Sequence, residues 1–278
     1  KRVSSLNRPN NVDIEYGFAL GPDTIDIVAT TERFTSEIRL FSLPELKPID
    51  NGGIPVFEGE KERAPMGIGL YRQPVTGKIF AIVGRKTGPE KQYLWQYELH
   101  SDSTGVIDGK VVRKFGKFSG KKEIEAILVD DEMEQVYYSD EGVGVRQYGA
   151  NPDDPDKELA LFATDGIKDD HEGLSLYAKP NGGGYLILSD QQANEFHLYA
   201  RSHQGEVTSH PLIKVVAAST IESDGNEATS YSFNPLYPDG FLVAMSDDKT
   251  FQIYEWKNFF SEEEIVNDSA VTAIPDNL

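Results

Sequence analysis

The chain has 278 residues, 38% of them hydrophobic, which is enough for one large all-β domain or two small ones. It carries 46 Asp and Glu against 27 Lys and Arg, which gives a net charge of -19. This charge argues against a nucleic-acid partner, because phosphate backbones are bound by clustered Lys and Arg side chains. It has no cysteine and no run of 18 apolar residues, which excludes disulfides, thiolate chemistry and a membrane-spanning helix. The acidic balance permits divalent cations, and it is equally typical of a surface that keeps a protein in solution.

The first strands are expected near the N-terminus. Alternating apolar and polar residues predict a strand over 11–20, and Gly21-Pro22-Asp23 predicts the turn that follows it. Further strands are expected over 24–30 and 37–42. The next segment, 43–59, contains Pro and Gly and has room for a fourth strand.

This pattern restarts four times along the chain. Five copies of a three- or four-stranded meander, at a period of roughly 50–58 residues, are the signature of a β-propeller. We therefore predict an all-β fold, a β-propeller with five visible blades, as a single domain over 1–278 with an acidic tail from about 260. Ser261-Glu262-Glu263-Glu264 in that tail is typical of the start of a short helix. The strands expected in the later copies are 67–71, 79–83, 94–99 and 110–115; 124–129, 136–138, 144–148 and 159–163; 169–177, 185–189, 196–200 and 207–213; and 229–233, 241–245 and 251–256.

The fourth copy places polar side chains at both ends of a predicted hairpin. Asp170 and Glu172 stand at the start of its first strand, and Asp190 and Gln191 follow its second. Because an antiparallel hairpin brings these two ends to the same edge, the four side chains should meet there. Carboxylate and amide oxygens are ligands for hard cations. His171 is either a ligand or an exposed loop histidine, and the exposed loop is the interpretation that we favour.

The other copies carry charged residues at the same rim. Arg33 and Lys86 add basic side chains to the acidic ones at this rim. The combination suits a phosphate ester, because metals held by the acids would neutralise phosphoryl oxygens and Arg binds phosphate with two hydrogen bonds. Solvated loop charges are the simpler interpretation of the same pattern. On the opposite rim, Asp130 and Asp131 are expected to form turns. The second strands of the five copies end at Glu32-Arg33, Arg85-Lys86, Asp140-Glu141, Asp190-Gln191 and Asp247-Asp248.

Several segments, spread over nearly the whole chain, carry a resemblance to a known family. They are 10–16, 109–113, Glu125 with 130–132, 170–177, 185–201, and 224–225 ahead of 237–238. In these segments the chain resembles the β-propeller phytases, which are calcium-dependent 3-phytases. The resemblance implies a six-bladed propeller that hydrolyses phytate (myo-inositol hexakisphosphate) through direct attack of a calcium-bound water, without a phosphoenzyme. It also implies a secreted or periplasmic protein.

The same resemblance assigns roles to individual residues. Phosphate contacts are implied at Arg33 and Lys86, and the catalytic residues are implied to be Glu125, Glu172 and Asp224. The calcium ligands that it implies are Glu125, Glu141, Asp170, Glu172, Gln191 and Asp224.

The chain also departs from the family pattern. Five blades are visible where the family has six, and the family's N-terminal segment would precede Lys1. Ala126 stands where the family has Gly, and Met66 where it has Tyr. We therefore expect an N-terminally incomplete domain, a monomer or one part of a tandem-domain protein, or a scaffold that has lost part of its site.

Three functions remain open from the sequence. The first is a calcium-dependent phytase-type phosphomonoesterase. The second is an inactive or weakly active propeller domain that binds calcium and phosphorylated ligands, and the third is an interaction scaffold with an acidic rim. The expected partner is phytate or another phosphate ester, with no nucleic acid and no membrane.

Overall fold

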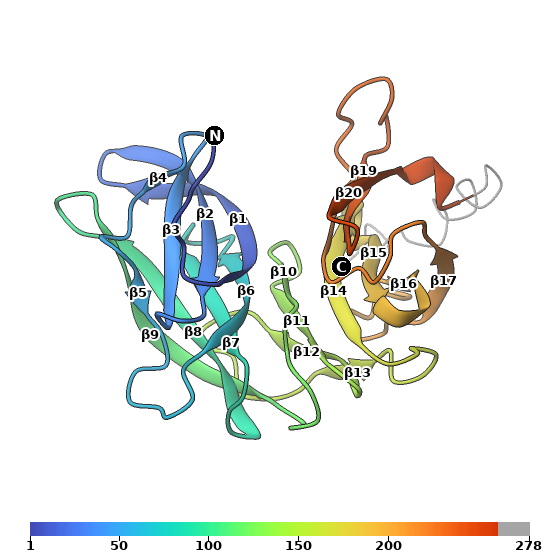
Figure 1. Cartoon of the computed structure of the whole chain (residues 1–278), viewed down its shortest axis with the longest axis horizontal. Coiled ribbons are helices and arrows are strands. Elements are labelled where there is room, and N and C mark those ends of the chain that lie inside the picture. Colours follow the sequence, from blue (N-terminus) through green and yellow to red (C-terminus); the bar gives the residue numbers. More distant parts are fainter. Residues whose placement is uncertain (261–278) are drawn as a thin grey trace. The chain divides into compact units, whose positions relative to one another are not determined.

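The computed structural model describes residues 1–260, so the acidic tail and the helix predicted at its start lie outside the described residues. The described chain forms five antiparallel meanders that follow one another in sequence (Figure 1). Its helical elements are three single-turn 3-10 helices, η1 (Pro180–Gly182), η2 (Gln191–Ala193) and η3 (Trp256–Asn258). In this part of the chain no helix is long and apolar enough to cross a membrane.

The strands fall into the five predicted copies. The first meander contains β1 (Pro9–Leu20), β2 (Asp23–Glu32), β3 (Glu37–Leu43), β4 (Lys47–Pro48) and β5 (Ile54–Pro55); the second contains β6 (Pro65–Arg72), β7 (Ile79–Arg85), β8 (Lys91–Ser101) and β9 (Ile107–Lys117); the third contains β10 (Ile127–Asp130), β11 (Gln135–Asp140), β12 (Gly144–Gly149) and β13 (Ala160–Phe162); the fourth contains β14 (His171–Ala178), β15 (Gly184–Asp190), β16 (Glu195–Ala200) and β17 (Leu212–Ala217); and the fifth contains β18 (Asn226–Thr229), β19 (Phe241–Ser246) and β20 (Thr250–Glu255). The predicted all-β fold of the β-propeller class, with five blades, is therefore confirmed. A sixth blade and a single domain over 1–278 stay predictions.

Two strands lie elsewhere than predicted. The strand expected over 207–213 is β17, which begins at Leu212, directly after Pro211. Proline cannot donate to a strand ladder, and the preceding residues form a short turn in which His203 bridges Glu206. The strand expected over 229–233 is β18, which ends at Thr229, where the register pairs it with Phe241.

The chain divides into two compact units. Unit 1 comprises residues 1–140 and 148–158, and unit 2 comprises 141–147 and 159–278. In unit 1, β6 and β7 are buried along almost their whole length, and the register pairs Ile68 with Val83. Such continuous apolar runs are typical of strands that are covered on both faces.

The core of unit 2 is rich in aromatic side chains. The rings of Tyr177 and Trp256 are stacked with centroids 3.5 Å apart, and Tyr185 and Phe260 pack beside them. Because Tyr177 and Tyr185 come from the hairpin β14–β15, this cluster fixes the end of the hairpin that is remote from Asp170 and Asp190.

Candidate metal and phosphate site

Unit 2 brings three of the predicted ligands into one hydrogen-bonded chain. Asp170 lies directly before β14, Gln191 directly after β15, and Asp224 in the segment that leads into β18. The Gln191 side-chain amide donates to Asp224 Oδ1. Gln192 completes the chain, because its Nε2 lies 2.7 Å from Asp170 Oδ2 and 2.6 Å from Gln191 Oε1. The sequence analysis identified all of these residues except Gln192.

Gly173 is the reason that Asp224 comes close to this hairpin. A Cβ atom at Gly173 would lie 2.9 Å from Gly225 Cα and 2.8 Å from Asn226 Nδ2. The segment also receives a hydrogen bond of 2.8 Å from Ser189 Oγ to the carbonyl oxygen of Ser223. Glycine at position 173 therefore allows the segment of Asp224 to approach the hairpin closely.

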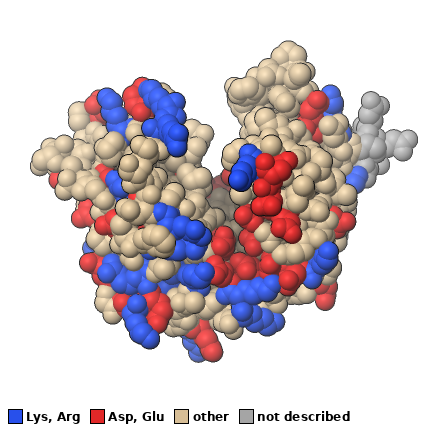
Figure 2. All heavy atoms as spheres, viewed as in Figure 1, with Lys and Arg blue, Asp and Glu red and all other residues tan. Residues whose placement is uncertain are grey.

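The electrostatics of Asp224 favour a bound cation. Loss of hydration raises the pKa of Asp224, the Gln191 amide acts in the opposite direction, and the nearby Asp247 carboxylate raises the pKa further. A carboxyl group with a raised pKa is one whose negative charge is poorly compensated, and a cation supplies that compensation. Figure 2 shows Asp and Glu side chains gathered on the part of unit 2 that carries β14.

Two further predicted ligands in unit 2 are buried carboxylates. Glu172 is the second residue of β14 and Glu141 follows β11, and both are buried. His171, between Asp170 and Glu172, is also buried, and its Nε2 lies 2.8 Å from the carbonyl oxygen of Ala163. The interpretation of His171 as an exposed loop histidine is therefore wrong, because it is the first residue of β14 and lies opposite Asp190 in the register.

Unit 1 contains the other three predicted site residues. Glu125 lies just before β10, and its carbonyl oxygen is 2.2 Å from the position that a Cβ at Gly67 would occupy. Arg33 follows β2, donates to Asn10 Oδ1 at 2.5 Å, and contacts Met66 Sδ through the same Nη2 atom. Met66, which departs from the family pattern, is thus a direct neighbour of the predicted phosphate-binding guanidinium.

Arg85, the last residue of β7, and Lys86, which follows it, differ in their surroundings. Arg85 is buried, with its guanidinium carbon 4.6 Å from the ring centroid of Phe57, and its role is structural. Lys86 is half-exposed and forms an ion pair of 2.7 Å with Glu123. Lys86 is therefore the one of the two that a phosphate in solution can reach.

One group of side chains suited to bind a metal was not predicted from the sequence. Asp190, Glu195 and His197 lie on β15 and β16 with one ligand atom of each within 4.8 Å of the others. Asp190 had been assigned to the rim with Gln191. The detectable signal was the spacing of Glu195 and His197, which places both side chains on one face of a strand.

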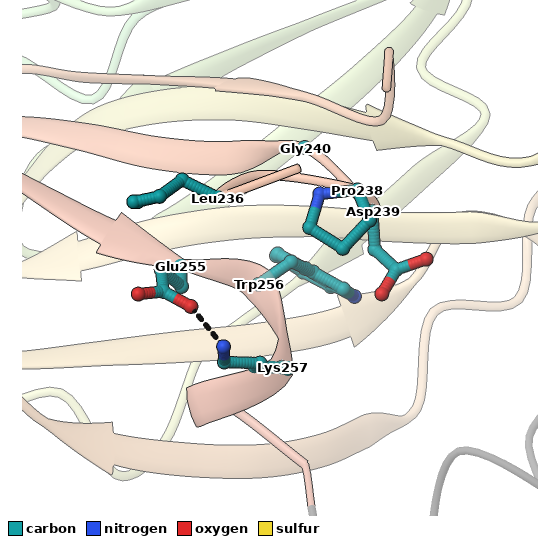
Figure 3. A pocket seen from close by; sticks show the side chains of 7 residues that line it. All are labelled: Leu236, Pro238, Asp239, Gly240, Glu255, Trp256 and Lys257. Carbon is teal, nitrogen blue, oxygen red and sulfur yellow. Dashed lines mark ion pairs between the residues drawn. The ribbon is translucent and has the colours of Figure 1, made fainter. Parts of the chain in front are cut away.

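A small hollow on the fifth meander is a poor candidate for the site. It contains at most about 140 Å³ of empty space, open solvent included, and is lined by Leu236, Pro238, Asp239, Gly240, Glu255, Trp256 and Lys257 (Figure 3). Its cation, Lys257, is paired with Glu255 at 2.5 Å. Ligand pockets usually measure about 300–1,000 Å³, so this hollow is too small for a hexakisphosphate.

Comparisons with known proteins agree with this description. A model of the family described as Phytase matches residues 1–267. The curated 3-phytase of Bacillus subtilis (strain 168) is 29% identical over 271 residues, which cover 89% of this chain and 68% of that protein.

A solved structure shares the fold. It is a chain of the humanized mutant of the Chaetomium thermophilum Polycomb Repressive Complex 2 bound to the inhibitor GSK126, which matches with a TM-score of 0.56 and 11% identity over 91% of this chain. This chain spans about half, 51%, of the length of that one, and the likeness concerns the fold alone.

Proposed function

The chain belongs to the phytase family and is a phytase-type hydrolase, and from this premise we propose that it hydrolyses phytate in a calcium-dependent manner. In the proposed reaction, a water oxygen bonds to phosphorus while the bond between phosphorus and the ester oxygen breaks, without a phosphoenzyme. The observation that best supports calcium dependence is the linked set of Asp170, Gln191 and Asp224 in unit 2.

The donor atoms in unit 2 fit calcium. All the side chains proposed as ligands there offer carboxylate or amide oxygens, which are the ligands that Ca²⁺ takes in proteins. The raised pKa of Asp224 shows a carboxylate that lacks a compensating charge. When bound, calcium supplies positive charge that offsets the charge of the phosphate ester and acidifies water. We propose Glu141, Asp170, Glu172, Gln191 and Asp224 in unit 2, and Glu125 in unit 1, as ligands of calcium ions. Of these residues, we propose that Glu125, Glu172 and Asp224 also serve the reaction.

We propose that Arg33 and Lys86 bind phosphate groups of the substrate. Each follows the second strand of its meander, and each presents a cation near that strand end. A phosphate group would compete with Glu123 for the Lys86 ammonium, and it would share the Arg33 guanidinium with Asn10. In both cases phosphate, with its higher charge, makes the stronger hydrogen bonds.

One observation supports the alternative of an inactive or weakly active domain that binds calcium and phosphorylated ligands. The Arg33 guanidinium is in contact with Met66 as well as Asn10. A thioether is a weak acceptor and cannot orient the guanidinium as a hydroxyl group would. This arrangement would lower activity while leaving the oxygen ligands of unit 2 unaffected.

The remaining proposals concern organisation and location. We propose that residues 1–278 form a single propeller domain, with the acidic tail from about 260, that acts as a monomer or within a tandem-domain protein. We also propose that the protein is secreted or periplasmic. Detection of the protein in the extracellular or periplasmic fraction of its native cells tests the location, and its presence only in the cytosol would contradict it.

Phosphate release from phytate, measured with calcium and again with a chelator, tests the proposed function. We expect release that needs calcium and that is lost in Glu172→Ala, together with the calcium-dependent rise in melting temperature. Absence of release, with calcium still raising the melting temperature, would favour the alternative. If calcium changes neither quantity, the ligand assignment is wrong.

A further inference from the structure

A group of side chains in the fourth meander that could bind a metal differs in chemistry from the proposed calcium ligands, because it contains an imidazole. Asp190 is the last residue of β15 and pairs with Glu195, the first residue of β16, across the hairpin. His197 lies two residues further along β16, so its side chain is on the same face of the sheet as Glu195. The fold therefore directs one imidazole and two carboxylates to one point.

The distances in this group are too long for hydrogen bonds and suit an ion between the side chains. His197 Nε2 lies 3.7 Å from Asp190 Oδ2 and 3.8 Å from Glu195 Oε2. Ligand atoms around a tetrahedral zinc ion, with bonds of about 2.0–2.2 Å, are separated by ~3.4 Å. Both distances from His197 Nε2 lie within a few tenths of an ångström of that separation.

Three polar atoms of the group are buried and lack hydrogen-bond partners in the described part of the chain. The side chain of His197 is 3% exposed, and neither of its ring nitrogens has a hydrogen-bond partner among residues 1–260. The side chain of Asp190 is 1% exposed, and its Oδ1 likewise has no hydrogen-bond partner in the described chain. The other oxygen, Oδ2, accepts from the Lys168 backbone N–H at 2.9 Å. Buried polar atoms without partners are costly, and a bound cation would satisfy them.

The mixture of ligands indicates the class of metal. Calcium takes six to eight oxygen ligands, whereas imidazole nitrogen with carboxylates suits zinc and the neighbouring divalent transition metals. Glu195, whose side chain is 37% exposed, gives an ion access from solvent.

We propose that Asp190, Glu195 and His197 bind one divalent transition-metal ion of the zinc class at the end of the hairpin β15–β16. The turn of this hairpin is η2, which carries Gln191 and Gln192 of the proposed calcium site. An ion here would hold both strands at the point where this turn begins. The proposal does not depend on hydrolysis of phytate, because it concerns binding and stability.

Metal titration of the full-length protein tests this proposal. The protein is stripped with a chelator, saturated with calcium, and titrated with Zn²⁺ by calorimetry, and with Co²⁺ as a spectroscopic probe. We expect one equivalent of Zn²⁺ to bind with a rise in melting temperature, and Co²⁺ to give the visible absorption of a low-coordinate site that contains nitrogen. Absence of Zn²⁺ binding, or a site that excess calcium empties, would overturn the proposal.

Two variants and a control locate the ion. Glu195→Gln and His197→Gln should each weaken Zn²⁺ binding at least about tenfold. His100→Gln changes a histidine on an exposed part of β8 and should leave binding unchanged. Glu195 is partly exposed, so its Gln variant is expected to fold, which calcium-dependent melting verifies. Unchanged Zn²⁺ affinity in folded Glu195→Gln would contradict the assignment, as would a loss in His100→Gln.

Discussion

Gly173 on β14 lies directly against Asn226 on β18, and the Asn226 side-chain amide donates to the carbonyl oxygen of Gly173 at 2.9 Å. A methyl group at Gly173 would approach the Asn226 backbone nitrogen to 2.9 Å and Gly225 Cα to the same distance. Both contacts are shorter than a carbon atom normally makes, and both involve backbone atoms. Gly173 therefore sets the position of the segment that carries Asp224.

The first prediction follows from this contact. Gly173→Ala should displace the segment of Asp224, lower the free energy of unfolding by about 1–3 kcal/mol, and reduce the stabilisation by calcium. Gly84→Ala is the matched control, because the added methyl group would meet ordinary contacts of 3.4 Å or more. Denaturant unfolding with and without calcium measures both effects. If calcium stabilises the two variants equally, the close approach at Gly173 does not support the metal site.

The second prediction concerns the charge of Asp224. Asp224→Asn keeps the size of the side chain and removes the charge, so calcium affinity should fall at least about tenfold. Stability without calcium should be equal or slightly higher in this variant, because desolvation and the Asp247 carboxylate disfavour the charged form of Asp224 in the folded state. Glu222→Gln, an exposed change two residues away, removes the same charge and should leave calcium affinity unaltered. The shift in melting temperature on calcium addition distinguishes the two variants, and equal shifts would exclude Asp224 as a ligand.

The third prediction is a pH dependence that arises in unit 1. Burial, and then the charge of Asp131, raise the pKa of Glu15 to about 8, and burial raises the pKa of Asp131 to about 6. The folded chain thus keeps protons that the unfolded chain releases above a pH of about 4.5. The stability that these protons give is full below that pH and is lost as the pH rises toward 8.

Substitution of Glu15 isolates this effect. Glu15→Gln mimics the protonated carboxyl group, so it should be more stable than the parent at pH 9 by at least ~1 kcal/mol, and nearly equal to it at pH 5. Urea unfolding at constant ionic strength, with chelator present to remove the contribution of the metal, gives the comparison. A parent protein whose stability does not decline between these pH values would show that the buried pair is not protonated.

Much of this fold was predictable from sequence because its elements are local. Strand periodicity and turn residues located the meanders, and the hairpin β14–β15 placed Asp170 near Gln191. The two strands whose predicted ranges were wrong, β17 and β18, lie beside long turns. There, residues typical of strands continue beyond the paired part of the strand.

The remaining features depend on contacts between meanders, on strand register or on short turns, which periodicity does not report. Asp131 was predicted as a turn former, and it lies in a turn, but it also accepts a hydrogen bond from the Arg72 backbone at 3.0 Å and raises the pKa of Glu15. The ligand group around His197 was missed because its recognition requires the exact register of β15 with β16. Gln192 was missed because its role depends on the short helix η2.

The last prediction separates phosphate binding from metal binding. Arg33→Lys keeps the positive charge but loses the planar donor pair that binds phosphate with two hydrogen bonds, so kcat/KM for phytate should fall about tenfold or more. Calcium should still raise the melting temperature of this variant as it does in the parent, because the Arg33 side chain donates to Asn10 and contacts Met66. Arg8→Lys, at an exposed arginine, is the control for the change of side-chain type and should leave kcat/KM unaltered. Steady-state kinetics, or calorimetry with phytate if turnover is too slow to follow, provides the measurement. Loss of the calcium response in Arg33→Lys would mean that Arg33 supports the metal ligands, and unchanged kinetics would remove it from the phosphate site.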